Sequence, residues 1–185
     1  MQGSIGRRLV LAAASGTLAA ALAGRQGAAA ALGKLTETGP KPLPDFSFVD
    51  PDGQTRRVAD FAGQGLVINL WATWCPPCVA EMPALDRAQA TLDAEGIRVL
   101  PLSSDRGGRT QVEPFYQRVG IQHLGVWLDP RGAAQRALGA RGLPTTVIVD
   151  REGKERARLE GGAEWDSAEM LAAVRRLVGP ASSQT

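Results

Sequence analysis

The residues best suited to chemistry gather in one short segment, Trp71–Pro83, which reads WATWCPPCVAEMP. This segment holds both cysteines of the chain, Cys75 and Cys78, and a carboxylate, Glu81, three residues further on. A Cys-x-x-Cys pair between a strand and a helix is typical of dithiols that exchange with disulfides. The segment therefore predicts a redox site centred on Cys75 and Cys78.

A helix that begins at Pro76 would make the two thiols unequal. Cys75 would be its N-cap residue, where free backbone N–H groups and the helix dipole favour a thiolate, so Cys75 is the expected nucleophile. Cys78, one turn inside, is the expected resolving thiol. Because Pro76 and Pro77 have no N–H, only the Cys78 amide remains to donate to the Cys75 sulfur. A weakly stabilised thiolate keeps the disulfide hard to reduce, so we expect a reductant.

Glu81 follows Cys78 by three residues and would lie on the same helix face, one turn on. A partly buried carboxylate there could accept the Cys78 proton while this thiol resolves a mixed disulfide. The alternative is a solvated acid that the helix dipole favours in the first turn. The sequence leaves both interpretations open.

Two other uses of the cysteine pair are disfavoured. A purely structural disulfide would close a ring of only four residues, where the gain in loop entropy is smallest. A zinc site needs four ligands, and the chain has no further Cys and one His, His123, which is expected on the surface. We therefore expect redox chemistry without a metal or another cofactor.

Regular elements on both sides of the segment are expected to position it. The apolar run Leu66–Trp71 predicts a buried strand directly before the cysteines. Alternation of strands and helices elsewhere predicts an α/β fold, with a mixed sheet and helices on both faces. Further strands are expected over 46–49, 55–58, 97–102, 126–128, 145–149 and 154–160, and helices over 76–94, 110–119, 133–138 and 167–178.

The N-terminal segment resembles an export signal. Arg7 and Arg8 precede the uncharged run Leu9–Ala23, and small residues that fit a cleavage site follow. Fifteen helical residues span roughly 22 Å, less than the hydrocarbon core of about 30 Å, which favours a cleaved signal over a retained anchor. The two arginines fit either a general secretory (Sec) or a twin-arginine signal. Both routes lead to a compartment where disulfides persist.

The predicted organisation is a signal peptide or membrane anchor over 1–31, a Pro-rich linker over 32–44, one domain over 45–180 and a flexible tail over 181–185. Of the 21 Lys and Arg residues, three lie in the first 31 positions, which contain no acid. The remaining 18 basic residues face 19 acidic ones, about −1 in net charge. This balance gives no support to nucleic-acid binding.

The residues around the cysteines, with Asp52-Gly53, Ser103-Ser104-Asp105 and Gly142-Leu143-Pro144-Thr145-Thr146, closely resemble the TlpA/ResA-like branch of the thioredoxin family. The resemblance implies a thioredoxin-like fold with an N-terminal β-hairpin and an inserted central helix–strand unit. It also implies an exported thiol:disulfide oxidoreductase that reduces partners such as apocytochrome c or copper-site assembly proteins. A membrane thiol donor would return electrons to this periplasmic enzyme, which we expect to be a monomer.

By the same resemblance, Pro144 is a cis-proline beside the dithiol, and Leu143 and Thr145 flank the substrate groove. Trp74, Pro76 and Pro77 would complete this groove, with Trp74 partly exposed, whereas Trp71, Trp127 and Trp165 are expected to pack in the interior. Thioredoxin has an Asp at the strand position of Asn69, so Glu81 is the better candidate here for a proton acceptor.

Two rival functions remain. A peroxiredoxin-like antioxidant enzyme also has a Glu three residues after a cysteine, but its motif requires Thr three residues before that cysteine, where this chain has Cys75. A non-enzymatic copper-binding assembly protein could hold Cu(I) with two thiolates, although no Met/His cluster supports it. We expect a periplasmic oxidoreductase that works by mixed-disulfide exchange.

Overall fold

A mixed sheet of eight strands runs through the centre of the computed structural model, which describes residues 35–181. The strand order is β1-β8-β7-β4-β5-β6-β2-β3. Pairing is parallel between β4 and β5 and between β5 and β6, and antiparallel elsewhere. The strands are β1 (Leu35–Pro42), β2 (Ser47–Val49), β3 (Thr55–Arg57), β4 (Gly65–Trp71), β5 (Ile97–Ser103), β6 (Trp127–Leu128), β7 (Thr145–Val149) and β8 (Lys154–Glu160).

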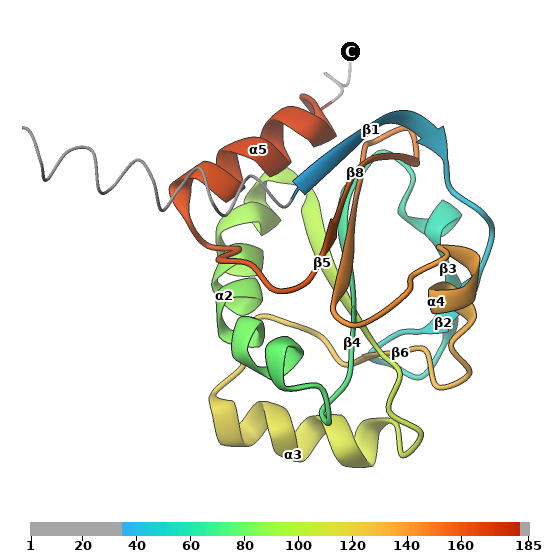
Figure 1. The fold of residues 1–185 in the computed structure, drawn as a ribbon, viewed down its shortest axis with the longest axis vertical. Coiled ribbons are helices and arrows are strands. Elements are labelled where there is room, and N and C mark those ends of the chain that lie inside the picture. The colour runs from blue at the N-terminus through green and yellow to red at the C-terminus, as the bar shows by residue number, and fades with distance from the viewer. Residues whose placement is uncertain (1–34, 182–185) are drawn as a thin grey trace, which may run out of the picture.

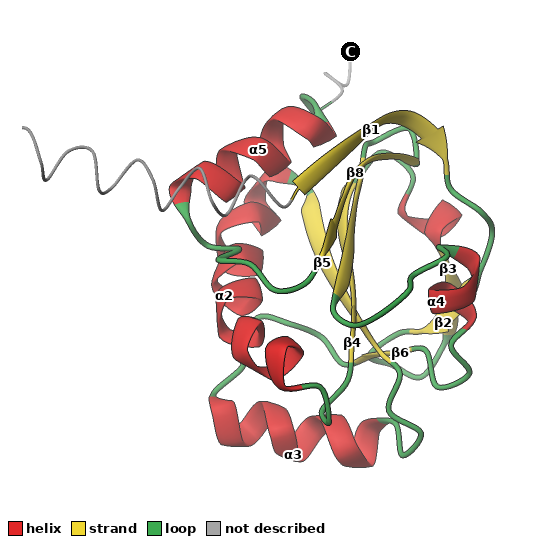
Figure 2. Ribbon diagram, viewed as in Figure 1, coloured by secondary structure: helices red, strands yellow, loops and turns green. Residues whose placement is uncertain are grey.

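Helices cover both faces of this sheet, as expected. Figures 1 and 2 show α2 and α5 on one side and α4 on the other. None of the helices within residues 35–181 combines the length and the apolar character needed to cross a membrane. The helices are α2 (Pro76–Leu92), α3 (Arg109–Val119), α4 (Ala133–Ala137) and α5 (Ala168–Val178), with short 3-10 turns η1 (Val58–Phe61) and η2 (Asp93–Glu95).

The two faces have separate apolar cores because successive side chains of a strand point to opposite sides. On β4, Val67 joins the cluster formed with α2, α3 and α5, whereas Leu66 and Ile68 join the cluster that includes Ala134 of α4. Every residue of β4 is buried. This is why β4 reads as a nearly continuous apolar run, interrupted only by Asn69, rather than an alternating one.

The segment before residue 45 differs from its expected role as a linker. Residues 35–42 form β1, which pairs with β8 along one edge of the sheet, so the expected linker over 32–44 is corrected here. The register shifts between Glu37 and Lys41, around Gly39 and Pro40. Proline is tolerated on an edge strand because one side of that strand needs no ladder hydrogen bonds. The expected signal or anchor over 1–31, like residues 182–185 of the expected tail, lies outside the described residues.

Two hairpins use the same turn chemistry at distant places. Asp50 Oδ1 accepts hydrogen bonds from the amides of Asp52 and Gln54, and its Oδ2 pairs with Arg56. Asp150 repeats the pattern, with the amides of Glu152 and Lys154 and the side chain of Arg156. The first of these turns joins β2 to β3, which confirms the expected N-terminal hairpin. The expected inserted unit is also present, as α3 and β6.

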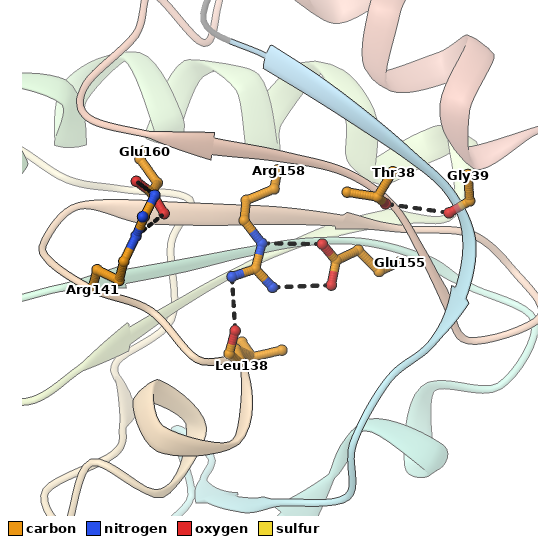
Figure 3. Close-up of polar contacts among 7 residues, drawn as sticks. All are labelled: Thr38, Gly39, Leu138, Arg141, Glu155, Arg158 and Glu160. Atoms are coloured by element: carbon orange, nitrogen blue, oxygen red, sulfur yellow. Dashed lines mark hydrogen bonds and ion pairs between the residues drawn. The ribbon is translucent and has the colours of Figure 1, made fainter.

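A bulge in β8 places a buried ion pair under α4. Ile148 lies opposite Ala157 but Val149 lies opposite Glu155, so Arg156 is the extra residue. Glu155 and Arg158 consequently share one face of the sheet and form a two-bonded ion pair at 3.1 Å. Arg158 also donates to the carbonyl of Leu138 at 2.7 Å, at the C-terminal end of α4 (Figure 3).

Candidate active site

The dithiol lies at the junction between the end of β4 and the start of α2. Cys75 is the N-cap residue of α2, as expected, and a disulfide joins it to Cys78. Cys75 is 5% exposed and Cys78 is completely buried. No hydrogen bond reaches the Cys75 side chain as a helix cap, and Pro76 and Pro77 occupy the first two helical positions. Of the two sulfur-bearing residues, Cys75 is therefore the one that a partner can reach more easily.

The surface beside the disulfide is apolar and open. Trp74 is 67% exposed, the only large hydrophobic side chain among the described residues with that character. Pro76 and Pro77 are also exposed. Trp71, by contrast, is buried, and its indole nitrogen donates to the carbonyl of Pro101. The structure thus separates the two tryptophans as expected, with one facing outward and one in the core.

A buried carboxylate, Asp105, holds the loop that leads into the dithiol. It accepts hydrogen bonds from the Thr73 amide at 2.9 Å and from the Thr73 hydroxyl at 2.7 Å. The Ser103 hydroxyl donates to it at 2.8 Å. In the sequence, Asp105 stands out only as part of the Ser103-Ser104-Asp105 segment of the family resemblance. Its contacts tie the end of β5 to the segment between Trp71 and Cys75.

The segment that opens β7 lies next to the end of β4. The peptide bond between Leu143 and Pro144 is cis, as the resemblance implies. Thr145 is in register with Leu70, and Leu143 packs against the core cluster that contains both cysteines. The amide of Gly161 donates to the Pro144 carbonyl at 2.9 Å. The strand register thus brings the expected groove residues Leu143, Pro144 and Thr145 to the dithiol end of the sheet.

Glu81 is buried, 4% exposed, and the interpretation as a solvated first-turn acid is wrong. Its Oε1 accepts a hydrogen bond from Asn69 Nδ2 at 2.8 Å. Its Oε2 accepts from Trp165 Nε1 at 2.8 Å and from the Ala163 amide at 3.1 Å. Burial raises the pKa of Glu81 above its ordinary value, and these hydrogen bonds oppose that rise. A carboxyl with a raised pKa is suited to accept and return a proton nearer neutral pH.

Trp165 and Asn69 are contacts of Glu81 that sequence reasoning missed. The sequence predicts only core packing for Trp165, and for Asn69 only the replacement of an acid by an amide. Nothing in the local spacing connects residue 165 with residue 81, since they meet only when the loop after β8 folds over α2. Trp127, which is also expected to pack in the interior, lies in the core on the α4 side of the sheet.

Other features lie apart from this site. His123 is exposed in the connection between α3 and β6, as expected. A cavity of about 620 Å³, lined by residues including Leu43, Phe61 and Arg151, adjoins the start of β4, at the opposite end of that strand from the dithiol. No group of three or more side chains suited to hold a metal ion occurs within residues 35–181.

A dithiol at the start of a helix, a cis-proline at the same end of the sheet and a mixed sheet between helical layers define a thioredoxin-like thiol:disulfide oxidoreductase. Comparison with known proteins agrees with this class. Residues 39–174 match the Redoxin family, and the chain belongs to that family.

Its curated relatives include the thiol-disulfide oxidoreductase ResA of Geobacillus thermodenitrificans, which is 31% identical over 118 residues, or 64% of this chain and 67% of the relative. Among solved structures, the chain is similar to the pneumococcal exposed lipoprotein thioredoxin of Streptococcus pneumoniae, with 27% identity and a TM-score of 0.60 over 71% of this chain and 98% of that one. It is also similar to a secreted thiol-disulfide isomerase of Corynebacterium glutamicum, with 25% identity and a TM-score of 0.61 over 74% and 84% of the two chains.

Proposed function

We propose that the chain is a periplasmic protein-disulfide reductase that works by mixed-disulfide exchange. The observation that carries the proposal is the asymmetry of the dithiol, with Cys75 at the helix N-cap and Cys78 fully buried behind it. The two prolines after Cys75 limit the stabilisation of its thiolate, which favours reduction of partners over their oxidation. The signal-like composition of residues 1–31 supports export.

The reaction transfers two electrons from the dithiol to a disulfide of the partner. The Cys75 thiolate attacks one sulfur of that disulfide, the partner S–S bond breaks, and its second sulfur leaves as a thiolate. Cys78 then gives its proton to Glu81 and attacks the Cys75 sulfur, which breaks the mixed disulfide and forms the Cys75–Cys78 bond. The proton on Glu81 returns to one partner thiolate, and the other takes up from the solvent the proton that Cys75 released on ionising, so the partner leaves as a dithiol.

The expected groove supplies the surface on which a partner segment lies. Trp74, Pro76 and Pro77 form its exposed outer side. At the start of β7, the partly exposed Leu143 forms the other side, whereas Pro144 and Thr145 are buried there. Following the family resemblance, we propose apocytochrome c or copper-site and oxidase assembly proteins as partners. A membrane dithiol donor would reduce the Cys75–Cys78 disulfide after each cycle, and the reductase would act as a monomer, either released by signal cleavage or anchored by residues 1–31.

Trapping tests this proposal. A Cys78→Ala variant retains the nucleophile but cannot resolve the mixed disulfide, so it should accumulate in cells as a covalent adduct between Cys75 and its partner. The adduct should disappear on reduction, and the matched Cys75→Ala variant should form none. Absence of any Cys75-dependent adduct would contradict the proposal. Rapid thiol-dependent consumption of peroxide by the wild-type protein would instead favour the antioxidant alternative.

A further inference from the structure

The Glu81 carboxylate of α2 is held by groups from two other parts of the fold. Asn69 belongs to β4, and Ala163 and Trp165 belong to the loop between β8 and α5. We propose that Asn69 and Trp165 are positioning residues, which fix the ionised Glu81 carboxylate on the face of α2 that carries Cys78. This inference rests on the proposed role of Glu81 as the proton acceptor for Cys78.

Every hydrogen-bonding partner of the carboxylate is a neutral N–H donor. Asn69 Nδ2 reaches Oε1, and Trp165 Nε1 and the Ala163 amide reach Oε2. Within residues 35–181, no ion pair includes Glu81. Hydrogen bonds therefore provide the local compensation for burying this charge, and each donor favours the ionised over the protonated form.

The surrounding elements add no competing charge at the carboxylate. On α2, Cys78 is the titratable neighbour one turn back, and Arg87 points outward to pair with Asp166. Beside Trp165 in the loop, Glu164 is exposed. β4 and β7 contribute the neutral side chains Asn69 and Thr146. A change in the pH response of Glu81 can therefore be traced to its hydrogen-bond donors.

The Asn69 side chain has a donor for the ionised form of Glu81 and an acceptor for its protonated form. Its Nδ2 donates to Glu81 and, at 2.9 Å, to the Thr146 hydroxyl. Its Oδ1 is fully buried and accepts no hydrogen bond from the described residues. Once Glu81 carries a proton, a half-turn of the amide would present this oxygen to the new O–H group, because the two ends of an amide differ only in donor and acceptor character.

The test uses the purified, reduced protein and the aromatic disulfide 5,5′-dithiobis(2-nitrobenzoate). Attack by Cys75 releases one thionitrobenzoate, and resolution by Cys78 releases a second in an intramolecular phase. The rate of this second phase should rise with pH as Glu81 ionises. Trp165→Phe retains an aromatic ring, although a smaller one, and loses one donor, so its midpoint should move up by about one pH unit. Trp127→Phe makes the same change at a distant buried tryptophan and should leave the midpoint unchanged.

The possible results separate this inference from the proposed function. If Glu81→Gln keeps the wild-type pH profile, the role of Glu81 is wrong and the inference falls with it. If Glu81→Gln abolishes the pH response but Trp165→Phe matches the wild type, only the positioning role is overturned. Failure to trap a cellular partner would count against the reductase function without altering either measurement.

A wild-type measurement avoids dependence on the folding of Trp165→Phe. Nuclear magnetic resonance of the reduced protein can follow the Glu81 carboxyl carbon and the Asn69 side-chain amide during one pH titration. Both signals should change with a common midpoint if the amide responds to the proton on Glu81. An Asn69 amide that stays constant while Glu81 titrates would overturn the proposal.

Discussion

At the scale of single residues, Pro77 is as informative as the cysteines it separates. It occupies the second position of α2, whose amide is one of the two that can reach an N-cap side chain. Proline removes that donor, so the Cys75 thiolate has one candidate fewer to stabilise it. The reducing character proposed for the pair thus rests on a missing N–H group.

Pro77→Ala restores this amide and should make the protein a weaker reductant. One added hydrogen bond to the thiolate is expected to raise the reduction potential by about 20 to 40 mV and to lower the Cys75 pKa. Equilibration with glutathione measures the potential. Pro83→Ala changes another proline of the same helix, away from the sulfur, and serves as the control. An unchanged or more negative potential in Pro77→Ala would contradict the argument.

The burial of Glu81 should also be visible in the stability of the oxidised protein, whose cysteines do not titrate. Its folded-state pKa is raised above the ordinary value of 4.5, so the folded state binds this proton more tightly than the unfolded state. The resulting stabilisation is complete below the ordinary pKa and is lost as pH rises through the folded-state pKa.

We therefore expect the free energy of unfolding of the wild type, minus that of Glu81→Gln, to fall with increasing pH above 4.5. Each unit of elevation in the pKa corresponds to about 1.4 kcal/mol. Urea unfolding of both oxidised proteins across a pH series measures the difference. A difference that stays constant or grows with pH would show that burial does not disfavour the charge.

At the scale of elements, the ion pair under α4 supports the segment that precedes Pro144. Arg158 joins the buried Glu155 of β8 to the Leu138 carbonyl at the end of α4 (Figure 3). Arg141, three residues before Pro144, pairs with Glu160 on the surface. Both arginines link β8 to the segment between α4 and β7, Arg158 through Leu138 and Arg141 through Glu160. The Glu155–Arg158 pair is buried, whereas the Arg141–Glu160 pair is exposed.

These two pairs should differ in their contribution to stability. Arg158→Ala leaves Glu155 buried and unpaired, and should lower the free energy of unfolding by about 3 kcal/mol. Arg141→Ala removes an exposed pair and should cost less than about 1 kcal/mol. Urea unfolding near neutral pH measures both. Similar losses in the two variants would refute the distinction drawn from burial.

At the scale of the whole molecule, the dithiol and the cavity lie at opposite ends of the sheet. The dithiol follows the last residue of β4, and the cavity of about 620 Å³ adjoins the first residues of that strand. β1 closes one edge of the sheet by pairing with β8, although all its side chains after Leu35 are exposed. Its stability comes from backbone pairing, which leaves no pattern of alternating apolar residues.

The sequence by itself determined the dithiol and the elements around it, because these depend on local periodicity and on helix-start chemistry. It predicted the buried β4 and the start of α2 at Pro76. The predicted linker is wrong for residues 35–42, which form β1, because the prolines and exposed side chains there resemble those of a linker.

Only the tertiary structure decided what surrounds Glu81. Residues 69, 81, 163 and 165 come from a strand, a helix and a loop, and no local spacing relates them. Whether a carboxyl in the first turns of a helix is solvated or buried depends on what folds over it. Here the loop after β8 covers α2, and Asn69, Ala163 and Trp165 supply the donors that make a buried carboxylate tolerable.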